Sequence, residues 1–422
     1  MTAALLRLNR RTFASLKHRN YRLFFGGQVV SVTGTWMQNV AMAWLVLDLT
    51  GSPVAVGILV LCQFLPFSVL GLFAGVFADR LDPRRLVMTT QAAAMVLATA
   101  LALLTLAGDP EPWQVYVLAA LRGTVLVFDA PARQAFTYQM VGPAELPNAV
   151  ALNSSLFNAA RVIGPALGGV IVAVFGPGLC FAANAVSFLA VLVALAAMNA
   201  HELVSLKREG ERPAIFAGTW EAMRYARRSP RVGIVLVLVA AVSTFAFNFN
   251  VLLPVLARET LGKGPEVFGI LSACFGAGAL AGALLAATIG RASIRLLLLG
   301  TAGFGVAELV LAPAQTLVVA AVCLLAAGLC FTVWSANANA SLQLRVPDAI
   351  RGRVLGLYFY AFLGLQPVGG LLSGWLADAG GTGLAFAVGG AVTLAATAVA
   401  FVKLGQLPHW KRALLDSSFT QR

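Results

Sequence analysis

The stretch GVFADRLDPRR, residues 75–85, gathers five charged side chains into its last seven positions, 79–85. The runs on either side, 53–78 and 86–108, contain no Asp, Glu, Lys or Arg. Charged side chains are costly inside a bilayer and well solvated at its surface, so such a cluster is expected where a chain turns between two spans. The stretch therefore predicts two membrane-spanning helices joined by a short polar turn.

The composition of the whole chain is that of an integral membrane protein. Of its 422 residues 59% are hydrophobic and 11% charged, whereas soluble domains carry roughly 25% charged residues. Apolar stretches long enough to cross a hydrocarbon core of about 30 Å recur along the whole chain. The sequence predicts an all-α membrane protein with twelve spans, at 21–48, 54–77, 86–107, 113–136, 148–174, 177–199, 231–257, 265–290, 294–312, 315–340, 350–377 and 381–403.

Lys and Arg concentrate on alternate connections between these spans. They precede the first span, follow the second, and fill residues 200–230 between the sixth and the seventh; only Arg258 and Lys263 break the alternation. The positive-inside rule then places both termini and residues 200–230 in the cytoplasm. The net charge of +13 thus needs no nucleic-acid partner, and we expect a multi-pass protein of a plasma membrane, the inner membrane in a bacterium, surrounded by lipid.

Two internal matches indicate a duplicated architecture. SPVAVGIL at 52–59 corresponds to GPEVFGIL at 264–271, and Pro143-Ala-Glu-Leu corresponds to Pro347-Asp-Ala-Ile, with glycine-rich clusters GPALGG (164–169) and QPVGG (366–370) downstream. The long polar break at 200–230 separates six predicted spans from six. We therefore predict an N-terminal six-helix bundle at 1–199, a cytoplasmic linker at 200–230, and a C-terminal bundle with a tail at 231–422. Parallel repeats of this kind place substrate sites between the halves, near the bilayer midplane.

The turn at 75–85 resembles a motif of the major facilitator superfamily, which reads G-x-x-x-D-R-x-G-R-[KR] between spans 2 and 3. The chain departs from this motif at two positions, because Asp82 replaces the second glycine and Pro83 the next arginine. The matching residues, which the resemblance marks as gating residues, are Gly75, Asp79, Arg80 and Arg84.

GPALGG in the fifth predicted span resembles the Gly-Pro motif of the superfamily's twelve-span drug/proton antiporters. Gly164 and Pro165 match, while Ala160 replaces the leading glycine. Small residues allow close helix contact and proline kinks a helix, both useful in a helix that rocks; plain packing is the alternative. The ordered segments LTGSP, FDAPARQA, VGPAELPNAVAL and RVIGPALGG resemble the branch that contains the enterobactin exporter and macrolide and multidrug exporters.

Charged residues inside predicted spans are candidates for function because burying them is costly. Arg122 lies near the middle of the fourth span and Arg161 is similarly deep in the fifth, where substrate or coupling roles compete with structural pairing. Asp129 and Arg133 lie four residues apart on one helical face and predict a local ion pair. Glu308 in the ninth span is either a buried coupling acid or a side chain that reaches outward toward the lipid headgroups.

Polar stripes mark a candidate cavity. Hydroxyl and amide groups recur on one helical face of the first span and of the tenth, and the seventh and eleventh spans add further polar side chains. The resemblance implies that spans 1, 4, 7 and 10 surround the cavity; bonding between helices is the alternative. The candidate cavity residues are Ser31, Thr35, Gln38, Arg122, Asn158, Arg161, Asn248, Ser335, Asn339, Tyr358 and Gln366, and the candidate coupling or gating residues are Gly75, Asp79, Arg80, Arg84, Asp129, Arg133, Gly164, Pro165 and Glu308.

The resemblance implies a secondary exporter of small amphipathic compounds that works by alternating access, with protons as the coupling ion, no cofactor and a monomeric state. Two alternatives stay open: a lipid or metabolite transporter without proton coupling, and a membrane scaffold that has lost transport. An enzyme is not expected, because the sequence contains no HExxH, GxSxG or P-loop motif.

Overall fold

The computed structural model describes residues 13–78, 81–108, 110–204 and 215–406. The predicted gating residues Asp79 and Arg80 lie outside these ranges. Within them the chain forms helices and no strand. In chain order the elements are η1 (Ala14–Lys17), α2 (Arg19–Thr50), α3 (Pro53–Ala78), α4 (Pro83–Ala107), α5 (Pro112–Phe175), α6 (Pro177–Ala196), η2 (Ala200–Glu202), α7 (Ile215–Arg228), α8 (Pro230–Phe245), α9 (Phe249–Val255), η3 (Leu256–Thr260), α10 (Pro265–Ile289), α11 (Ile294–Leu311), α12 (Leu317–Arg345), α13 (Asp348–Phe359), η4 (Tyr360–Gly364) and α14 (Gln366–Gly405).

Nine helices in the described part of the chain are long and apolar enough to cross a membrane. Two of these apolar segments, 64 residues from Pro112 and 58 residues from Asp348, would far exceed a core of about 30 Å if they were straight. Each is broken at glycine: Gly142 has φ 70°, and Gly380 and Gly381 are also non-helical. The all-α, multi-pass prediction is confirmed, while twelve as the exact number of spans stays a prediction.

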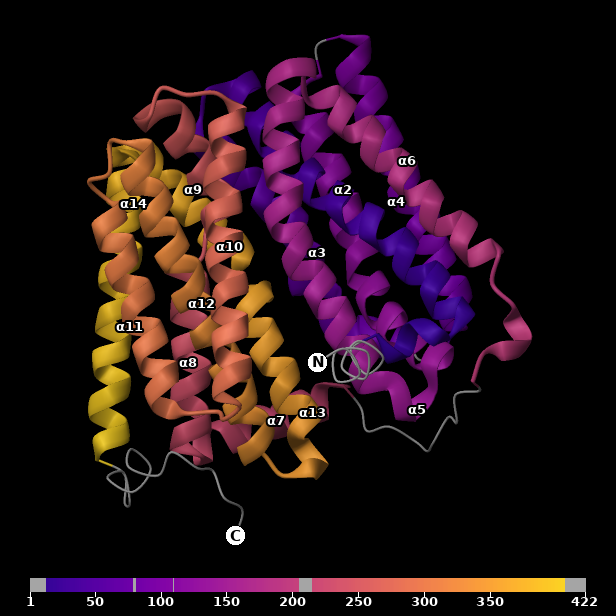
Figure 1. The fold of residues 1–422 in the computed structure, drawn as a ribbon. Helices are drawn as coiled ribbons and strands as arrows, with labels where there is room; N and C mark the ends of the chain where they lie inside the picture. Colours follow the sequence, from indigo (N-terminus) through magenta and orange to yellow (C-terminus); the bar gives the residue numbers. More distant parts are fainter. Residues whose placement is uncertain (1–12, 79–80, 109, 205–214, 407–422) are drawn as a thin grey trace, which may run out of the picture.

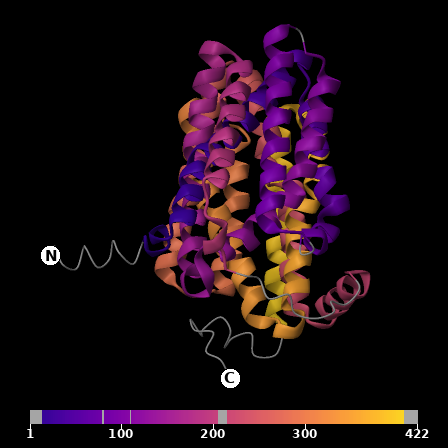
Figure 2. The ribbon, with the colours of Figure 1, turned by 90° about the vertical axis from the view of Figure 1, so that its right-hand side faces the viewer.

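The helices form two groups that lie side by side (Figure 1). Helices α2–α6 pack on one another, as do α8–α14, and the groups meet where α5 contacts α10 and α3 contacts α14. In both groups the long helices run roughly parallel to one another (Figure 2). Helix α7 packs against α13 at one end, named here the linker end. The opposite end, where α2 is followed by α3 and α5 by α6, is named the far end.

The turn at 81–85 has a local reason for departing from the family motif. The Asp82 side chain caps α4 by accepting a hydrogen bond from the Arg85 backbone N–H at 2.8 Å, and Pro83 occupies the first helical position. Both residue types are favoured at these positions. Arg84 donates to the carbonyl oxygen of Leu195 at 2.7 Å, which satisfies an orphan acceptor at the end of α6. The turn thereby ties α4 to α6, whereas Gly75 lies within α3.

Glycines allow α5 and α10 to touch across the two groups. A Cβ placed on Gly169 would lie 2.6 Å from the Pro265 carbonyl oxygen and 2.9 Å from the Gly269 Cα. A Cβ on Gly269 would lie 2.5 Å from the Pro165 carbonyl oxygen. Any larger residue would force these backbones apart, so the glycine at each position is required by the contact.

The equivalent contact joins α3 to α14. A Cβ on Gly57 would lie 2.7 Å from the Gly370 carbonyl oxygen, and one on Gly374 would lie 2.8 Å from that of Pro53. Residues 53 and 57 belong to SPVAVGIL, whose repeat GPEVFGIL supplies the α10 side of the first contact. The repeats recognised in the sequence therefore meet crosswise, each with a segment of the other group.

An ion pair adds to the contact between the groups at the far end. Arg258 donates to the Leu47 carbonyl oxygen at 2.9 Å and to the Asp48 carboxylate at 3.1 Å. Arg258 is one of the two basic residues that break the alternation of charge, and its bonds to the end of α2 give it a structural reason to lie there.

Candidate substrate and coupling sites

Arg161 lies beside two aromatic rings. Its guanidinium carbon is 5.3 Å from the centre of the Trp36 ring and 6.0 Å from that of Phe157, and the two rings meet edge to face at 5.7 Å. No carboxylate pairs with Arg161 in the described part of the chain. A cation held by aromatic faces alone stays available to an anionic or polarised group of a ligand.

Arg122 lies where α5 packs against α3. The next residue, Gly123, contacts the Gln63 carbonyl oxygen and Pro66. The Arg122 Nη1 atom is buried and has no hydrogen-bond partner among the described residues. Both arginines lie well inside the two segments of α5, about 15 Å and 21 Å from the far end by the helix rise. The contacts do not join the two arginines to each other, and a substrate or coupling role for them stays a prediction.

Asp129 and Arg133 form the predicted ion pair, with Arg133 Nε 3.0 Å from the Asp129 carboxylate. The sequence analysis missed the partners that complete it. Thr90 and Gln91 of α4 donate to Asp129 at 2.7 and 3.0 Å, and Arg133 also donates to Gln28 of α2. The network joins α2, α4 and α5, as a structural role requires. Its signal in the sequence was the polar Thr-Gln pair inside an apolar span.

The polar stripe of the first span contributes to packing within its own group. Gln38 accepts a hydrogen bond from Asn184 of α6 at 2.5 Å, and Ser31 is buried while Thr35 is half-buried. The bond of Gln38 is of the kind expected from the alternative reading, in which polar groups join neighbouring helices. Asn158 donates to Ser154 of its own helix at 2.9 Å.

The candidate residues of α12 and α13 lie together. Tyr358 donates to the Ser335 carbonyl oxygen at 3.4 Å, and Asn339 accepts a hydrogen bond from Gln343 one turn further along α12. Tyr358 is buried, whereas Ser335 and Asn339 are half-buried. Tyr358 and Ser335 therefore belong to the packing of α13 against α12.

The seventh predicted span is interrupted, which the sequence analysis did not foresee. Helix α8 ends at Phe245 and α9 begins at Phe249. Gln366 donates to the freed carbonyl oxygen of Phe247 at 3.2 Å, and the Asn248 side chain lies against Gly369, where a Cβ would be 2.7 Å from Oδ1. Two predicted cavity residues thus hold the interruption in place.

Aromatic side chains pack around this interruption. Phe247 stacks on Phe331 with ring centres 4.3 Å apart, and Phe362 lies 5.7 Å from Phe247. Phe249 in turn contacts Phe275 at 4.7 Å. Burial of these rings supplies apolar contact that offsets the lost helical hydrogen bonds.

Glu308 lies inside the second group and does not reach outward. Its side chain is 0% exposed, and neither carboxylate oxygen has a hydrogen-bond partner among the described residues. A Cβ on Gly389 of α14 would lie 2.9 Å from Glu308 Oε2 and 2.8 Å from the Phe245 carbonyl oxygen. Glu308 therefore faces the end of α8, and the outward-reaching alternative is wrong.

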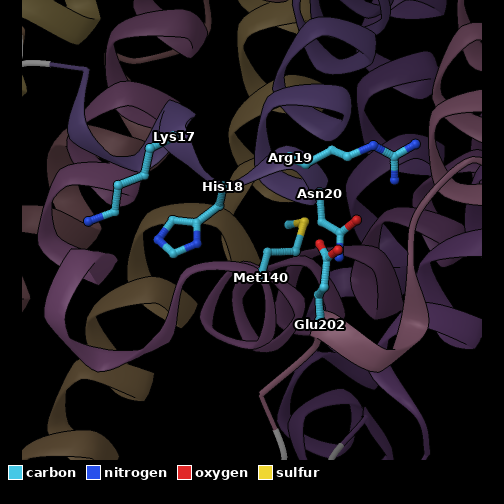
Figure 3. A pocket seen from close by; sticks show the side chains of 6 residues that line it. All are labelled: Lys17, His18, Arg19, Asn20, Met140 and Glu202. Atoms are coloured by element: carbon cyan, nitrogen blue, oxygen red, sulfur yellow. The ribbon is translucent and has the colours of Figure 1, made fainter.

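A cavity of about 390 Å³ lies elsewhere, near the start of α2. Figure 3 shows that Lys17 and Arg19 point to opposite sides of it, while Asn20 and Glu202 lie near each other. Lys17 pairs with Glu145. Because its cationic side chains point in different directions, this cavity offers no convergent site for a ligand. It contains none of the predicted site residues.

Paired groups of packed helices, repeats that meet crosswise and unpaired charges at mid-depth define a membrane transporter. The transmembrane secretion effector family matches residues 10–421, and the chain belongs to this family, an exporter branch of the major facilitator superfamily. The predicted resemblance is confirmed, as is the expectation that the chain is not an enzyme.

Relatives of known function cover nearly the whole chain. It is 27% identical over 383 residues to the staphyloferrin A transporter of Staphylococcus aureus, covering 90% of this chain and 94% of the relative. It is 25% identical to macrolide efflux protein A of Streptococcus pyogenes, with 86% and 91% covered, and 26% identical to the enterobactin exporter of Escherichia coli O1:K1, with 85% of each covered.

Solved structures agree on the fold. A POT family transporter in complex with 5-aminolevulinic acid superimposes with a TM-score of 0.75 at 11% identity, covering 94% of this chain and 96% of that one. The family match and the relatives, and not the shared fold, make the chain a multi-pass transporter of small molecules, related to efflux proteins for siderophores and drugs.

Proposed function

We propose that this protein is a secondary active exporter of small amphipathic compounds, driven by proton antiport in a bacterial inner membrane, with both termini cytoplasmic. The observation that carries the proposal is that two arginines at mid-depth in α5, Arg122 and Arg161, have no carboxylate partner in the described part of the chain. Arg161 lies against Trp36 and Phe157, and such a combination suits a compound with an apolar body and an acidic or polar group. The names of the relatives support export.

Alternating access is supported by the contacts between the two groups. Gly57, Gly169, Gly269 and Gly374 bring the groups into backbone contact in the far-end half, and Arg258 pairs with Asp48 at that end. We propose that residues 1–199 and 231–422 act as two rigid bundles, that the far end opens when these contacts part, and that the protein works as a monomer in lipid without a cofactor.

The test uses purified protein in proteoliposomes with an acidic interior. A panel containing a carboxylate siderophore, a macrolide and a cationic dye is added outside, and accumulation inside is measured with and without a protonophore. Proton antiport predicts accumulation that the protonophore abolishes. Transport that persists without the gradient would identify an uncoupled transporter, and absence of transport for every compound would favour a scaffold.

A further inference from the structure

The interruption between α8 and α9 leaves the end of a half-helix inside the protein. The last carbonyl groups of α8 lie beyond the regular helical pattern, and the backbone N–H groups of both Ala246 and Phe247 return to the Val242 carbonyl oxygen. Carbonyl groups at the end of a helix carry a partial negative charge. In transporters with broken helices such ends bind sodium ions or protons.

Glu308 lies against this half-helix end. A Cβ on Gly389 would lie 2.9 Å from Glu308 Oε2 and 2.8 Å from the Phe245 carbonyl oxygen, so both oxygen atoms border the space that a side chain at this position would fill. An ionised carboxylate here would be buried without a partner and beside a second negative group. A neutral carboxylic acid instead has a donor to offer to that carbonyl group.

No fixed positive charge competes for the carboxyl group. The charged residues of α8, α11, α12 and α14 lie at the ends of these helices or at the kink of α14. Measured along the helix axes by the rise per residue, they are at least about 12 Å, and mostly about 20 Å, from the position of Glu308. None pairs with Glu308 in the described part of the chain. The titratable groups on the elements around it are Arg231, Arg258, Glu259, Arg295, Cys323, Cys330, Arg345, Asp378 and Lys403.

Two hydroxyl groups extend the polar environment. Ser243 lies one turn before Ala246, and Thr393 lies one turn after Gly389. Each side chain is 0% exposed, and neither hydroxyl oxygen has a hydrogen-bond partner among the described residues. Buried polar groups are normally satisfied, so unsatisfied side chains on three helices that pack together through α14 indicate a site that is used.

We propose that Glu308 and the C-terminal end of α8 form a proton-binding site within the second group of helices, apart from the arginines of α5. The proton binds to a Glu308 carboxylate oxygen, the neutral acid donates to the end of α8, and release of the proton restores the carboxylate. The inference rests on the proposed proton-driven exporter and identifies where its proton binds.

Hydrogen bonds and helix contacts connect the site to the contact between the two groups of helices. The interruption begins at the residue after Phe245, and Gln366 of α14 donates to the Phe247 carbonyl oxygen. Four residues beyond Gln366, Gly370 contacts Gly57 of α3. A change in charge at Glu308 therefore acts on a half-helix that is bonded to the helix forming the far-end contact.

Infrared difference spectroscopy tests the site without any transported compound. Wild-type protein in lipid vesicles is taken from high to low pH, and the carbonyl-stretch band of a protonated carboxylic acid is followed. We expect a band that is lost in Glu308→Gln, shifted but present in Glu308→Asp, and unchanged in Glu111→Gln, which removes an exposed acid. The conservative pair keeps the test interpretable if one variant folds poorly.

Three results would overturn the proposal: no band in the wild type at any pH step, a band that survives in Glu308→Gln, or a band abolished at constant pH when choline is replaced by sodium, which would identify a sodium site. The outcome is separable from that of the proposed function. A band lost in Glu308→Gln in a protein that transports nothing supports the proton site and contradicts the exporter.

Discussion

Gly169 of α5 and Gly269 of α10 meet so closely that a Cβ on the first would lie 2.9 Å from the Cα of the second. The two residues belong to different groups of helices, and their contact holds the far-end half together. Replacing either one changes the distance between two backbones, since there is no side chain to move.

We expect Gly269→Val to part the two groups at the far end. Overpacking of about 1–3 kcal/mol corresponds to a shift of roughly 5–150-fold in a two-state population. Spin labels at the exposed positions Phe175 and Lys263 should report a longer distance in the variant. Gly26→Ala is the matched control, because a Cβ there meets nothing within 4 Å; an equal lengthening in both variants would contradict the assignment.

We expect Arg122→Ala and Arg161→Ala to abolish transport while the protein remains folded, because neither arginine has a carboxylate partner that would be left unpaired. Arg161→Lys should retain part of the activity, since a lysine also interacts with the Trp36 ring. Arg85→Ala, at the exposed start of α4, serves as the control. Wild-type transport rates in both alanine variants would show that these arginines lie outside the substrate site.

Arg133→Ala should destabilise the protein strongly, because it leaves the buried Asp129 without its cation. Breaking a buried pair costs about 3–5 kcal/mol, although Thr90 and Gln91 still donate to Asp129. Thermal unfolding in detergent measures the effect. The comparison is Lys17→Ala, which removes an ion pair whose lysine is 60% exposed and should cost at most about 1 kcal/mol. Similar unfolding temperatures for the two variants would refute the structural role.

The ion pair between Glu221 of α7 and Arg353 of α13 should hold the linker helix in place. Glu221→Arg is expected to speed hydrogen exchange in α7, and the double variant with Arg353→Glu should slow it again because the pair is restored with its charges exchanged. Global stability should change by no more than about 1 kcal/mol, since both side chains are partly exposed. Unchanged exchange in the single variant would show that α7 is held by its apolar contacts alone.

Apolar runs predicted the helix positions well because membrane crossing depends on local sequence. The pairing of Asp129 with Arg133, four residues apart, is confirmed for the same reason. Glu221 pairs with Arg353 of α13, a partner on another helix that the local sequence does not reveal.

Contacts between distant helices could not be read from the sequence. Gln38 was expected to line a cavity because its helical face is polar, and its side chain accepts a hydrogen bond from Asn184 of α6. The interruption after Phe245 was missed, and the side chain that bonds its freed Phe247 carbonyl group, Gln366, lies 119 residues away in α14. A polar side chain in an apolar span indicates a need for a partner, but only the packed structure determines which partner it finds.

The crosswise contact of SPVAVGIL and GPEVFGIL, each with the glycine-rich segment of the other group, has the form of a self-complementary dimer interface. Two separate half-length chains would have to find each other by diffusion to make it. Joining them in one polypeptide replaces that encounter with an intramolecular one at a high effective concentration. The contact itself can therefore be weak without any risk that the halves drift apart.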